Sequence, residues 1–334
     1  MKKLLVTGGC GFIGSCFIIR QINAGNMVVN LDNLTYAANP DNLSSIKNHP
    51  NYHFVKGDIL DQKLVSEIIE KFEIDVLVNF AAESHVDNSI SNPISFIQTN
   101  INGTFSLLNS ALKYWQSLSG GKMEEFRFVH ISTDEVYGSL DLDDPKFTEE
   151  NKYQPNSPYS ASKAASDHLV RAWTETYKLP AIITNCSNNF GARQHSEKLI
   201  PTIIRSCLEN KDIPIYGNGK NIRDWIYVED HCLGIELAIA KGEIGESYCF
   251  GGDAERQNIN IAEQICKILD GLKPKSDGTS YAKQIKFVED RKGHDFRYAI
   301  DSSKAKKLLG FKIEGGFEEK LSSTVNWYLS QINN

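Results

Sequence analysis

A glycine-rich turn close to the N-terminus constrains the fold of this chain more than any other feature. The apolar residues 4–6 are followed by the sequence TGGCGFIG at residues 7–14, and an amphipathic stretch begins directly after it. Glycine lets a backbone turn tightly and approach a ligand closely, and the N–H groups of a helix N-terminus bind phosphate. A strand, this turn and a helix therefore predict a dinucleotide pyrophosphate site. A tight turn without a ligand is the alternative interpretation.

Short apolar runs alternate with amphipathic stretches in the first half of the chain. After residues 4–6, apolar runs recur at residues 27–31, 53–55, 76–80, 126–132 and 181–185. Helical patterns lie between most of them, the clearest at residues 62–72, 94–115 and 160–177. Strands that alternate with helices form βαβ units, so we expect an α/β fold with a Rossmann-type doubly wound parallel sheet.

The alternation loosens after about residue 186, where Pro214 and the sequence GNG at residues 217–219 interrupt it. Helical patterns return at residues 260–269, 302–309 and 315–329. We expect residues 1–185 to form the dinucleotide-binding Rossmann domain and residues 186–334 to form mainly a smaller C-terminal substrate-binding lobe. The boundary is approximate, and the domains are discontinuous if the two parts share a strand.

Composition and charge exclude several functional classes. A chain of 334 residues, 41% of them hydrophobic, is long enough for about two domains with a sizeable core. Its net charge of −6 argues against broad nucleic-acid binding. It contains no apolar run of about 18 residues and no signal-peptide pattern, so we expect a cytoplasmic protein without a membrane partner. Seven cysteines without a C-x-x-C pair or zinc-ligand spacing predict reduced thiols and no metal site.

An acidic residue at the end of the second apolar run indicates which dinucleotide binds. Asp32 lies 18 positions beyond Gly14, close to the spacing of about 20 expected for the carboxylate that binds the adenosine ribose hydroxyls. No arginine or lysine follows at residues 33–35 to accommodate a 2′-phosphate, so we expect NAD rather than NADP. Asp58, after the third run, is either an acceptor for the adenine amino group or a simple turn residue.

Tyr159 and Lys163 form a Tyr-x-x-x-Lys pair at the start of a predicted helix, where side chains four positions apart share one face. A phenol titrates near pH ~10 in water, and a neighbouring ammonium group lowers that pKa. The pair is therefore suited to accept the proton of a substrate hydroxyl while the same carbon gives hydride to a nicotinamide. Chance matches to this short pattern are common, and an exposed helix face is the alternative.

Polar residues follow the fourth and fifth apolar runs, at the carboxyl edge where open α/β sheets bind ligands. Thr133 is placed to hydrogen-bond the hydroxyl being oxidised, and Asp134 and Glu135 put two carboxyl groups at the same strand end. A solvated loop is the alternative for this acidic pair. Ser84 is a candidate ligand for a phosphate or a sugar hydroxyl, and His85 is either a catalytic base or a structural neighbour of the site.

Seven segments are similar to those of one family. They are AAESHVD at 81–87, STDEVYG at 132–138, SPYSASK at 157–163, CSNNFG at 186–191, EKLIP at 197–201, RDWIYV at 223–228 and DRKGHDFRY at 290–298. With the glycine turn, they make the chain resemble the extended short-chain dehydrogenase/reductase family and, within it, nucleotide-sugar dehydratases of the dTDP-glucose 4,6-dehydratase type. The resemblance extends over nearly the whole chain, and the adjacent Asp134 and Glu135 are its most specific element.

The resemblance implies a hydro-lyase reaction in three steps. Tyr159, helped by Thr133 and Lys163, removes the proton of the sugar C4 hydroxyl as hydride passes from C4 to NAD. The 4-keto group acidifies C5, Glu135 removes the C5 proton, and Asp134 protonates the departing C6 hydroxyl. Hydride then returns to C6 and a proton from solvent returns to C5, so dTDP-glucose becomes dTDP-4-keto-6-deoxyglucose. Two carboxyl groups whose environments separate their pKa values supply the base and the acid together.

The resemblance also implies which residues contact the ligands. The expected NAD contacts are Gly8, Gly11, Phe12, Ile13, Gly14, Asp32, Asn33, Leu34, Thr35, Asp58, Ile59, Ala81, Ala82, Ser84, Thr99, Tyr159, Lys163 and Asn189. The expected nucleotide-sugar contacts are Ser84, Thr133, Asn188, Lys198, Leu199, Pro214, Tyr216, Arg223, Asn258, Asp290 and His294. Arg223 is the expected diphosphate ligand, because its planar guanidinium group suits paired oxygens, with a surface salt bridge as the alternative. The family also implies a homodimer joined through the helices at residues 94–115 and 160–177.

The chain departs from the family pattern in segments that bind the substrate. Asn88 and Asn185 replace the usual arginines, Phe190 replaces a tyrosine, and residues 191–195 lack the usual proline and aromatic character. These departures leave open a 4,6-dehydratase that acts on UDP-glucose or on a UDP- or GDP-amino sugar. A C4 epimerase and a non-catalytic NAD-binding protein are further alternatives. The acidic pair argues against the epimerase, and the complete set of candidate catalytic residues argues against the non-catalytic protein.

Overall fold

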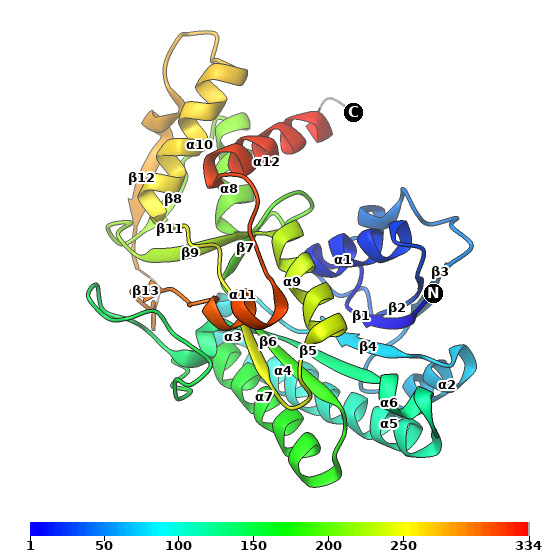
Figure 1. Cartoon of the computed structure of the whole chain (residues 1–334). Helices are drawn as coiled ribbons and strands as arrows, with labels where there is room; N and C mark the ends of the chain where they lie inside the picture. Colours follow the sequence, from blue (N-terminus) through cyan, green and yellow to red (C-terminus); the bar gives the residue numbers. More distant parts are fainter. Residues whose placement is uncertain (291, 333–334) are drawn as a thin grey trace.

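Seven parallel strands form the centre of the protein, in a computed structural model that describes residues 1–290 and 292–332 (Figure 1). They are β1 (Lys3–Thr7), β2 (Met27–Asp32), β3 (Tyr52–Lys56), β4 (Val76–Asn79), β5 (Arg127–Thr133), β6 (Ala181–Cys186) and β10 (Ser247–Phe250). Their order across the sheet is β10-β6-β5-β4-β1-β2-β3. This is the strand order of a Rossmann fold with one strand added beyond β6, so the predicted doubly wound parallel sheet is confirmed.

Helices cover both faces of this sheet (Figure 1). One face packs against α2 (Gln62–Phe72), α5 (Thr104–Ser117) and α7 (Pro158–Tyr177), and the other against α1 (Phe12–Asn23) and α9 (Val228–Lys241). Successive side chains of a strand point to opposite faces. In β1, Leu5 therefore packs into the first apolar layer, and Leu4 and Val6 pack into the second.

Most of the second half forms a smaller lobe with its own apolar core, which includes Ile203, Ile265 and Leu321. Its strands are β7 (Asn188–Phe190), β8 (Ile213–Tyr216), β9 (Ile222–Tyr227), β11 (Glu255–Gln257), β12 (Ile285–Val288) and β13 (Arg297–Tyr298). Its helices are α8 (Leu199–Leu208), α10 (Asn258–Leu272) and α12 (Phe317–Ile332), whereas α11 (Ser303–Leu309) packs on β10 and α9 beside the main sheet. Because β10 returns to pair with β6 in the main sheet, the second half is not confined to this lobe, and a division near residue 185 remains a prediction.

The helix predicted at residues 94–115 is interrupted. The chain forms α3 (Val86–Ser91), α4 (Pro93–Phe96) and then a π-helical segment, η2 (Ile97–Gly103), before α5 begins. Within this wider turn, Asn100 Oδ1 accepts the N–H of Glu83 at 2.8 Å, and Asn100 Nδ2 donates to Ser162 Oγ at 2.8 Å. The π-helical segment thus ties the chain after β4 to α7, at a position typical of functional sites.

Short helical turns complete the described part of the chain. They are η1 (Pro40–Leu43), α6 (Gly121–Glu125), η3 (Asp134–Tyr137) and η4 (Tyr281–Gln284). Every helix within the described residues is too short or too polar to span a bilayer.

Candidate active site

A cavity of about 320 Å³ lies along the carboxyl ends of the central strands, and it runs from the glycine turn to the start of α7. Of the predicted residues, it is lined by Gly8, Gly11, Phe12, Ile13, Gly14, Asp32, Asn33, Thr35, Asp58, Ile59, Ala81, Ala82, Ser84, Thr99, Thr133, Asp134, Glu135, Tyr159, Lys163, Asn188, Asn189 and Lys198. The five predicted catalytic residues therefore lie together. Leu34 is the one predicted cofactor residue that does not line the cavity, and its N–H donates to Asp32 Oδ1 at 2.8 Å.

The glycine turn is packed so closely that side chains would not fit. Gly8 has φ +69°, and a Cβ there would lie 2.7 Å from the backbone nitrogen of Ala81. A Cβ on Gly14 would lie 2.5 Å from the carbonyl oxygen of Gly8. Gly11 is the N-cap of α1 and has no side chain to occupy the N–H groups of the first helical turn. This end of the cavity therefore fits a pyrophosphate held by backbone donors.

Gly14→Ala is expected to lower the free energy of unfolding by about 1–3 kcal/mol and to weaken NAD binding, because the added methyl group must displace backbone. Gly121→Ala is the matched control, since a Cβ there meets no atom within 4 Å. Chemical denaturation and calorimetric titration with NAD measure the two effects. Equal stability and NAD affinity in the two variants would contradict this close packing.

Asp32 organises the next part of the cavity. Its Oδ2 accepts the N–H of Cys10 at 2.8 Å, so one buried carboxylate joins the end of β2 to the glycine turn. Asp58 Oδ2 accepts the side-chain amide of Asn33 at 2.8 Å, and Asp58 Oδ1 accepts the N–H of Leu60 at 2.9 Å. These hydrogen bonds stabilise the turn after β3, which agrees with the interpretation of Asp58 as a turn residue. Asp32, Asn33 and Asp58 all line the cavity beside the glycine turn, which fits the adenosine half of a dinucleotide.

Tyr159 and Lys163 lie on the buried face of α7, where they are 9% and 4% exposed. A capping box fixes the start of this helix: Ser157 accepts the N–H of Ser160, and the Ser160 hydroxyl accepts the N–H of Ser157 at 3.1 Å. Lys163 Nζ donates to the carbonyl oxygen of Ile131 at 2.8 Å. The cap and this hydrogen bond hold the pair against the end of β5.

The pKa of Tyr159 is raised well above its usual value rather than lowered. Burial is the largest cause and the charge of Glu135 the next, whereas a hydrogen bond with Thr133 acts in the opposite direction. The net shift is therefore opposite to the lowering that the Tyr-x-x-x-Lys pair predicts, because burial and the Glu135 carboxylate dominate. The influence of the Lys163 ammonium group on the phenol stays a prediction.

Asp134 and Glu135 begin the short turn η3, directly after β5. The Thr133 hydroxyl accepts the N–H of Glu135 at 3.3 Å, and it lies 3.3 Å from Asp134 Oδ1. A strand would point neighbouring residues to opposite faces, but this turn brings all three residues to one cavity. The predicted alternative of a solvated loop is wrong for Asp134, which is 2% exposed.

Asp134 is buried in an environment that favours its neutral form. Its Oδ2 is buried and has no hydrogen-bond partner among the described residues. Burial, followed by the charge of Glu135, raises the pKa of Asp134 well above its usual value. Glu135 is only partly buried. The site therefore combines a buried carboxyl group whose pKa is raised with a second, more accessible carboxyl group.

Residues 5–324 match the family model described as GDP-mannose 4,6 dehydratase. The chain is 51% identical over 330 residues to a dTDP-glucose 4,6-dehydratase of Xanthomonas campestris pv. campestris (strain B100), with 99% of this chain and 94% of that protein covered. The chain belongs to the dTDP-glucose 4,6-dehydratase family. It is thus a hydro-lyase within the extended short-chain dehydrogenases/reductases.

Two solved members of the family match nearly the whole chain. The crystal structure of the Bacillus anthracis dTDP-glucose 4,6-dehydratase in complex with NAD is 42% identical, has a TM-score of 0.88, and covers 100% of this chain and 98% of that one. The Streptomyces venezuelae dTDP-glucose 4,6-dehydratase, solved with NAD and a dTDP ligand, is also 42% identical with a TM-score of 0.88. That match covers 99% of this chain and 98% of the other.

Four residues predicted to contact the nucleotide sugar line the cavity of this family member: Ser84, Thr133, Asn188 and Lys198. Lys198 Nζ donates to the carbonyl oxygen of Ser84 at 2.9 Å. Asn188 Oδ1 is buried without a hydrogen-bond partner among the described residues, an arrangement that costs free energy unless a ligand donor meets it. A cation and an acceptor are thus available beside the catalytic residues.

The other predicted nucleotide-sugar residues lie outside the cavity, in the smaller lobe: Leu199, Pro214, Tyr216, Arg223, Asn258, Asp290 and His294. Arg223 is 6% exposed and stacks over the Tyr298 ring at 4.3 Å, so a surface salt bridge is the wrong interpretation. Its charge lowers the pKa of Asp134, which places it near the acidic pair. His294 Nδ1 lies 2.6 Å from Asp290 Oδ1. Arg291, part of the same similar segment, lies outside the described residues.

Thirteen cavity residues were not predicted: Leu31, Ala37, Ala38, Gly57, Phe80, Glu83, Ile131, Ser132, Cys186, Ser187, Gln194, His195 and Glu197. Glu83 and Glu197 matter most chemically, because burial and the charge of Glu197 raise the pKa of Glu83. Glu83 lies in the segment at 81–87 and Glu197 in the segment at 197–201, both of which are similar to the family. That similarity is the sequence signal that could have identified them as site residues. His85 accepts the N–H of Asn88 at 3.3 Å as the cap of α3, which supports its structural interpretation.

Among the described residues, no group of three His, Cys, Asp or Glu side chains is placed to hold a metal ion.

Proposed function

We propose that this chain converts dTDP-glucose to dTDP-4-keto-6-deoxyglucose, with NAD as its cofactor. The observation that carries this function is the convergence of Glu135, Tyr159 and the buried Asp134 on one cavity that begins at a dinucleotide-type glycine turn. Oxidation at C4 alone would need only Tyr159 and its partners. The acidic pair adds the groups that elimination of water requires.

Tyr159 and Thr133 act on the sugar C4 hydroxyl. The two side chains interact through a hydrogen bond that favours the phenolate. Bound NAD supplies a hydride acceptor and a positive charge that opposes the effect of burial on the phenol. The Lys163 ammonium group acts in the same direction, so Tyr159 accepts the C4 hydroxyl proton as the alcohol becomes a ketone.

Glu135 and Asp134 divide the elimination between them. Glu135, the more accessible carboxylate, removes the C5 proton that the C4 ketone has made acidic. Asp134, protonated because it is buried beside Glu135, gives its proton to the departing C6 hydroxyl. The negative charge on the base keeps the neighbouring acid protonated, so the two roles support each other.

The residues that bind the sugar diphosphate lie where the main sheet meets the smaller lobe. Lys198 and Asn188 line the cavity and offer a cation and an amide to sugar or phosphate oxygens. Arg223, near the acidic pair, has the planar donor geometry that suits a diphosphate. With these residues, the proposal names a substrate class, the nucleotide-diphosphate sugars, in addition to a reaction type.

Incubation with dTDP-, UDP-, GDP- and CDP-glucose and with UDP-N-acetylglucosamine tests this function. Mass spectrometry of the products should show loss of one water from dTDP-glucose, at a higher rate than from any other nucleotide sugar. Faster dehydration of another nucleotide sugar would move the substrate assignment to that nucleotide. Epimerised product without loss of water would overturn the dehydratase function.

We also propose a homodimer joined beside α5 and α7. Ile90, Ile94, Ile97 and Phe105 are apolar and 41–58% exposed, and they follow one another along α3, α4, η2 and α5. Such a cluster of apolar side chains is typical of an interface. Sedimentation equilibrium should give twice the mass of the chain for the unchanged protein and a single-chain mass for Phe105→Asp. A single-chain mass for the unchanged protein would contradict the dimer.

A further inference from the structure

Titratable side chains recur at every fourth position along the buried face of α7. Tyr159, Lys163 and Asp167 are all at most 9% exposed. Because residues four apart on a helix share a face, the three form one row that starts at the cavity and continues into the interior. Lys163 lines the cavity, whereas Asp167 does not. The row thus links a catalytic residue to a buried carboxyl group that has no part in binding the substrate.

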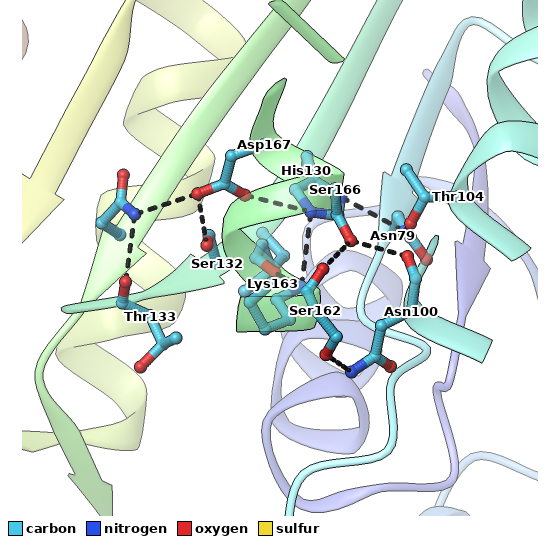
Figure 2. Close-up of polar contacts among 12 residues, drawn as sticks. Asn79, Asn100, Thr104, His130, Ser132, Thr133, Ser162, Lys163, Ser166 and Asp167 are labelled. Atoms are coloured by element: carbon cyan, nitrogen blue, oxygen red, sulfur yellow. Dashed lines mark hydrogen bonds and ion pairs between the residues drawn. The ribbon is translucent and has the colours of Figure 1, made fainter. Parts of the chain in front are cut away.

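His130 on β5 lies between Lys163 and Asp167 (Figure 2). Its Nε2 is 3.3 Å from Lys163 Nζ and 3.4 Å from Asp167 Oδ1. The ring is fully buried. All three side chains are therefore in contact within a space that excludes water, where charges interact strongly.

The tautomer of His130 follows from its other nitrogen. Asn79 Oδ1 accepts the Thr7 hydroxyl at 2.7 Å, so Asn79 Nδ2 faces His130 Nδ1 at 3.3 Å. An amide nitrogen only donates, so Nδ1 must accept and the ring proton lies on Nε2. Burial, followed by the charge of Lys163, lowers the pKa of His130 to about 4, and the ring is neutral. Its Nε2–H therefore lies beside Asp167 Oδ1, with 3.4 Å between nitrogen and oxygen, and Nε2 has no lone pair to accept from Lys163.

Asp167 is surrounded by donors. Its Oδ2 accepts the Ser132 hydroxyl at 2.7 Å and the Tyr153 hydroxyl at 2.9 Å, and Asn185 Nδ2 lies at 3.5 Å. With the His130 ring at Oδ1, the carboxylate faces four donor groups from β5, β6 and the segment before α7. Hydrogen bonds of this kind stabilise the ionised form of a buried carboxyl group.

The groups around Lys163 carry few other charges. From α7 the charge of Asp167 acts on it, and from β6 the Cys186 thiol does. From β5 it contacts the His130 ring and the carbonyl oxygen of Ile131. The neighbouring π-helical segment contributes neutral contacts, through Asn100 to the hydroxyls of Ser162 and Ser166 (Figure 2). Burial lowers the pKa of Lys163, and the charge of Asp167 is the largest influence that raises it.

We propose that Asp167, with the neutral His130 beside it, is a positioning residue that keeps Lys163 in its ammonium form next to Tyr159. This inference rests on the proposed function, because it assigns Lys163 the task of favouring the Tyr159 phenolate. Removal of the carboxylate leaves the buried ammonium group without its counter-charge. Lys163 then loses its proton at a lower pH, and Tyr159 loses the neighbouring positive charge.

Asp167→Asn tests the carboxylate, and Tyr153→Phe is its matched control, because it removes one hydrogen bond to Asp167 but leaves the charge. For Asp167→Asn, kcat at neutral pH should fall by about 10²-fold, the lower end of what a positioned acid–base group contributes. The acidic limb of the kcat profile should move to higher pH, while KM stays close to that of the unchanged protein. Tyr153→Phe should leave the position of the limb unchanged. Coincident limbs for all three proteins would overturn the inference.

A direct measurement of Lys163 separates this inference from the proposed function. NMR titration of ¹³C-lysine-labelled protein without substrate, with the signal assigned by Lys163→Met, should place the Lys163 midpoint at lower pH in Asp167→Asn. An unchanged midpoint, together with normal dehydration of dTDP-glucose by the unchanged protein, would overturn the inference alone. Absence of dehydration by the unchanged protein would instead overturn the proposed function.

If Asp167→Asn does not fold, the histidine provides the test in the unchanged protein. ¹⁵N NMR of His130, assigned by His130→Gln, should show a neutral ring with its proton on Nε2 throughout the neutral range. A charged ring, or a proton on Nδ1, would break the link between His130 and Asp167 and would contradict the inference.

Discussion

Tyr159→Phe is expected to lower kcat for dehydration of dTDP-glucose by about 10³-fold, within the usual contribution of a positioned acid–base group. The phenol lines the cavity and interacts with Thr133, so it is placed to accept the C4 hydroxyl proton, and phenylalanine fills the same space without that oxygen. A 10³-fold loss corresponds to about 4 kcal/mol of transition-state stabilisation. Steady-state kinetics with mass-spectrometric detection of the product measures the change.

Tyr177→Phe is the control for this substitution, because Tyr177 lies on the same helix, is 46% exposed and does not line the cavity. It should retain the kcat of the unchanged protein. NAD affinity should be similar in all three proteins, since the phenol oxygen is one contact among many in the cofactor region. A Tyr159→Phe protein with full activity would show that another group removes the C4 proton.

Glu135→Gln and Asp134→Asn are expected to stop dehydration at different points. Without the Glu135 carboxylate, the C5 hydrogen cannot be removed, so substrate deuterated at C5 should keep its label. Without the Asp134 proton, C5 can still exchange with solvent, but expulsion of the C6 hydroxyl lacks its acid. Each variant should form product about 10²- to 10⁴-fold more slowly, and only Asp134→Asn should release deuterium from C5.

The rate of dehydration by the unchanged protein should depend on pH in a way that follows from Asp134 as the acid and Glu135 as the base. Asp134 has to be protonated to act as an acid, so elimination should slow as pH rises through its raised pKa. Asp143→Asn, at an exposed position, is the control for charge removal and should leave the rate and the profile unchanged. Release of C5 deuterium by Glu135→Gln and retention by Asp134→Asn would reverse the two assigned roles.

The parts of the fold that depend on local pattern could be predicted from the sequence. Apolar runs such as residues 27–31 alternate with helical stretches, and this is sufficient to predict parallel strands. The glycine turn with Asp32 predicts a dinucleotide site because the spacing is a direct consequence of how a strand, a turn and a helix pack. The structure places all of these residues as expected.

The parts that depend on tertiary context could not be predicted in the same way. Residues 97–103 form a π-helical segment, in which hydrogen bonds span five residues instead of four, and β10 returns to the main sheet after 60 residues in other elements. The raised pKa of Tyr159 depends on how completely it is buried, which the Tyr-x-x-x-Lys spacing does not show. The contact of His130 with Lys163 joins two elements, and no local motif marks it.

Transfer of hydrogen from C4 to C6 of one sugar is the most direct test of the catalytic cycle assigned to this cavity. With dTDP-glucose deuterated at C4, NMR of the product should show the label in the C6 methyl group, and a parallel reaction in deuterium oxide should introduce solvent deuterium at C5. A C6 methyl group that carries solvent deuterium and has lost the C4 label would contradict internal hydride return and, with it, the cycle.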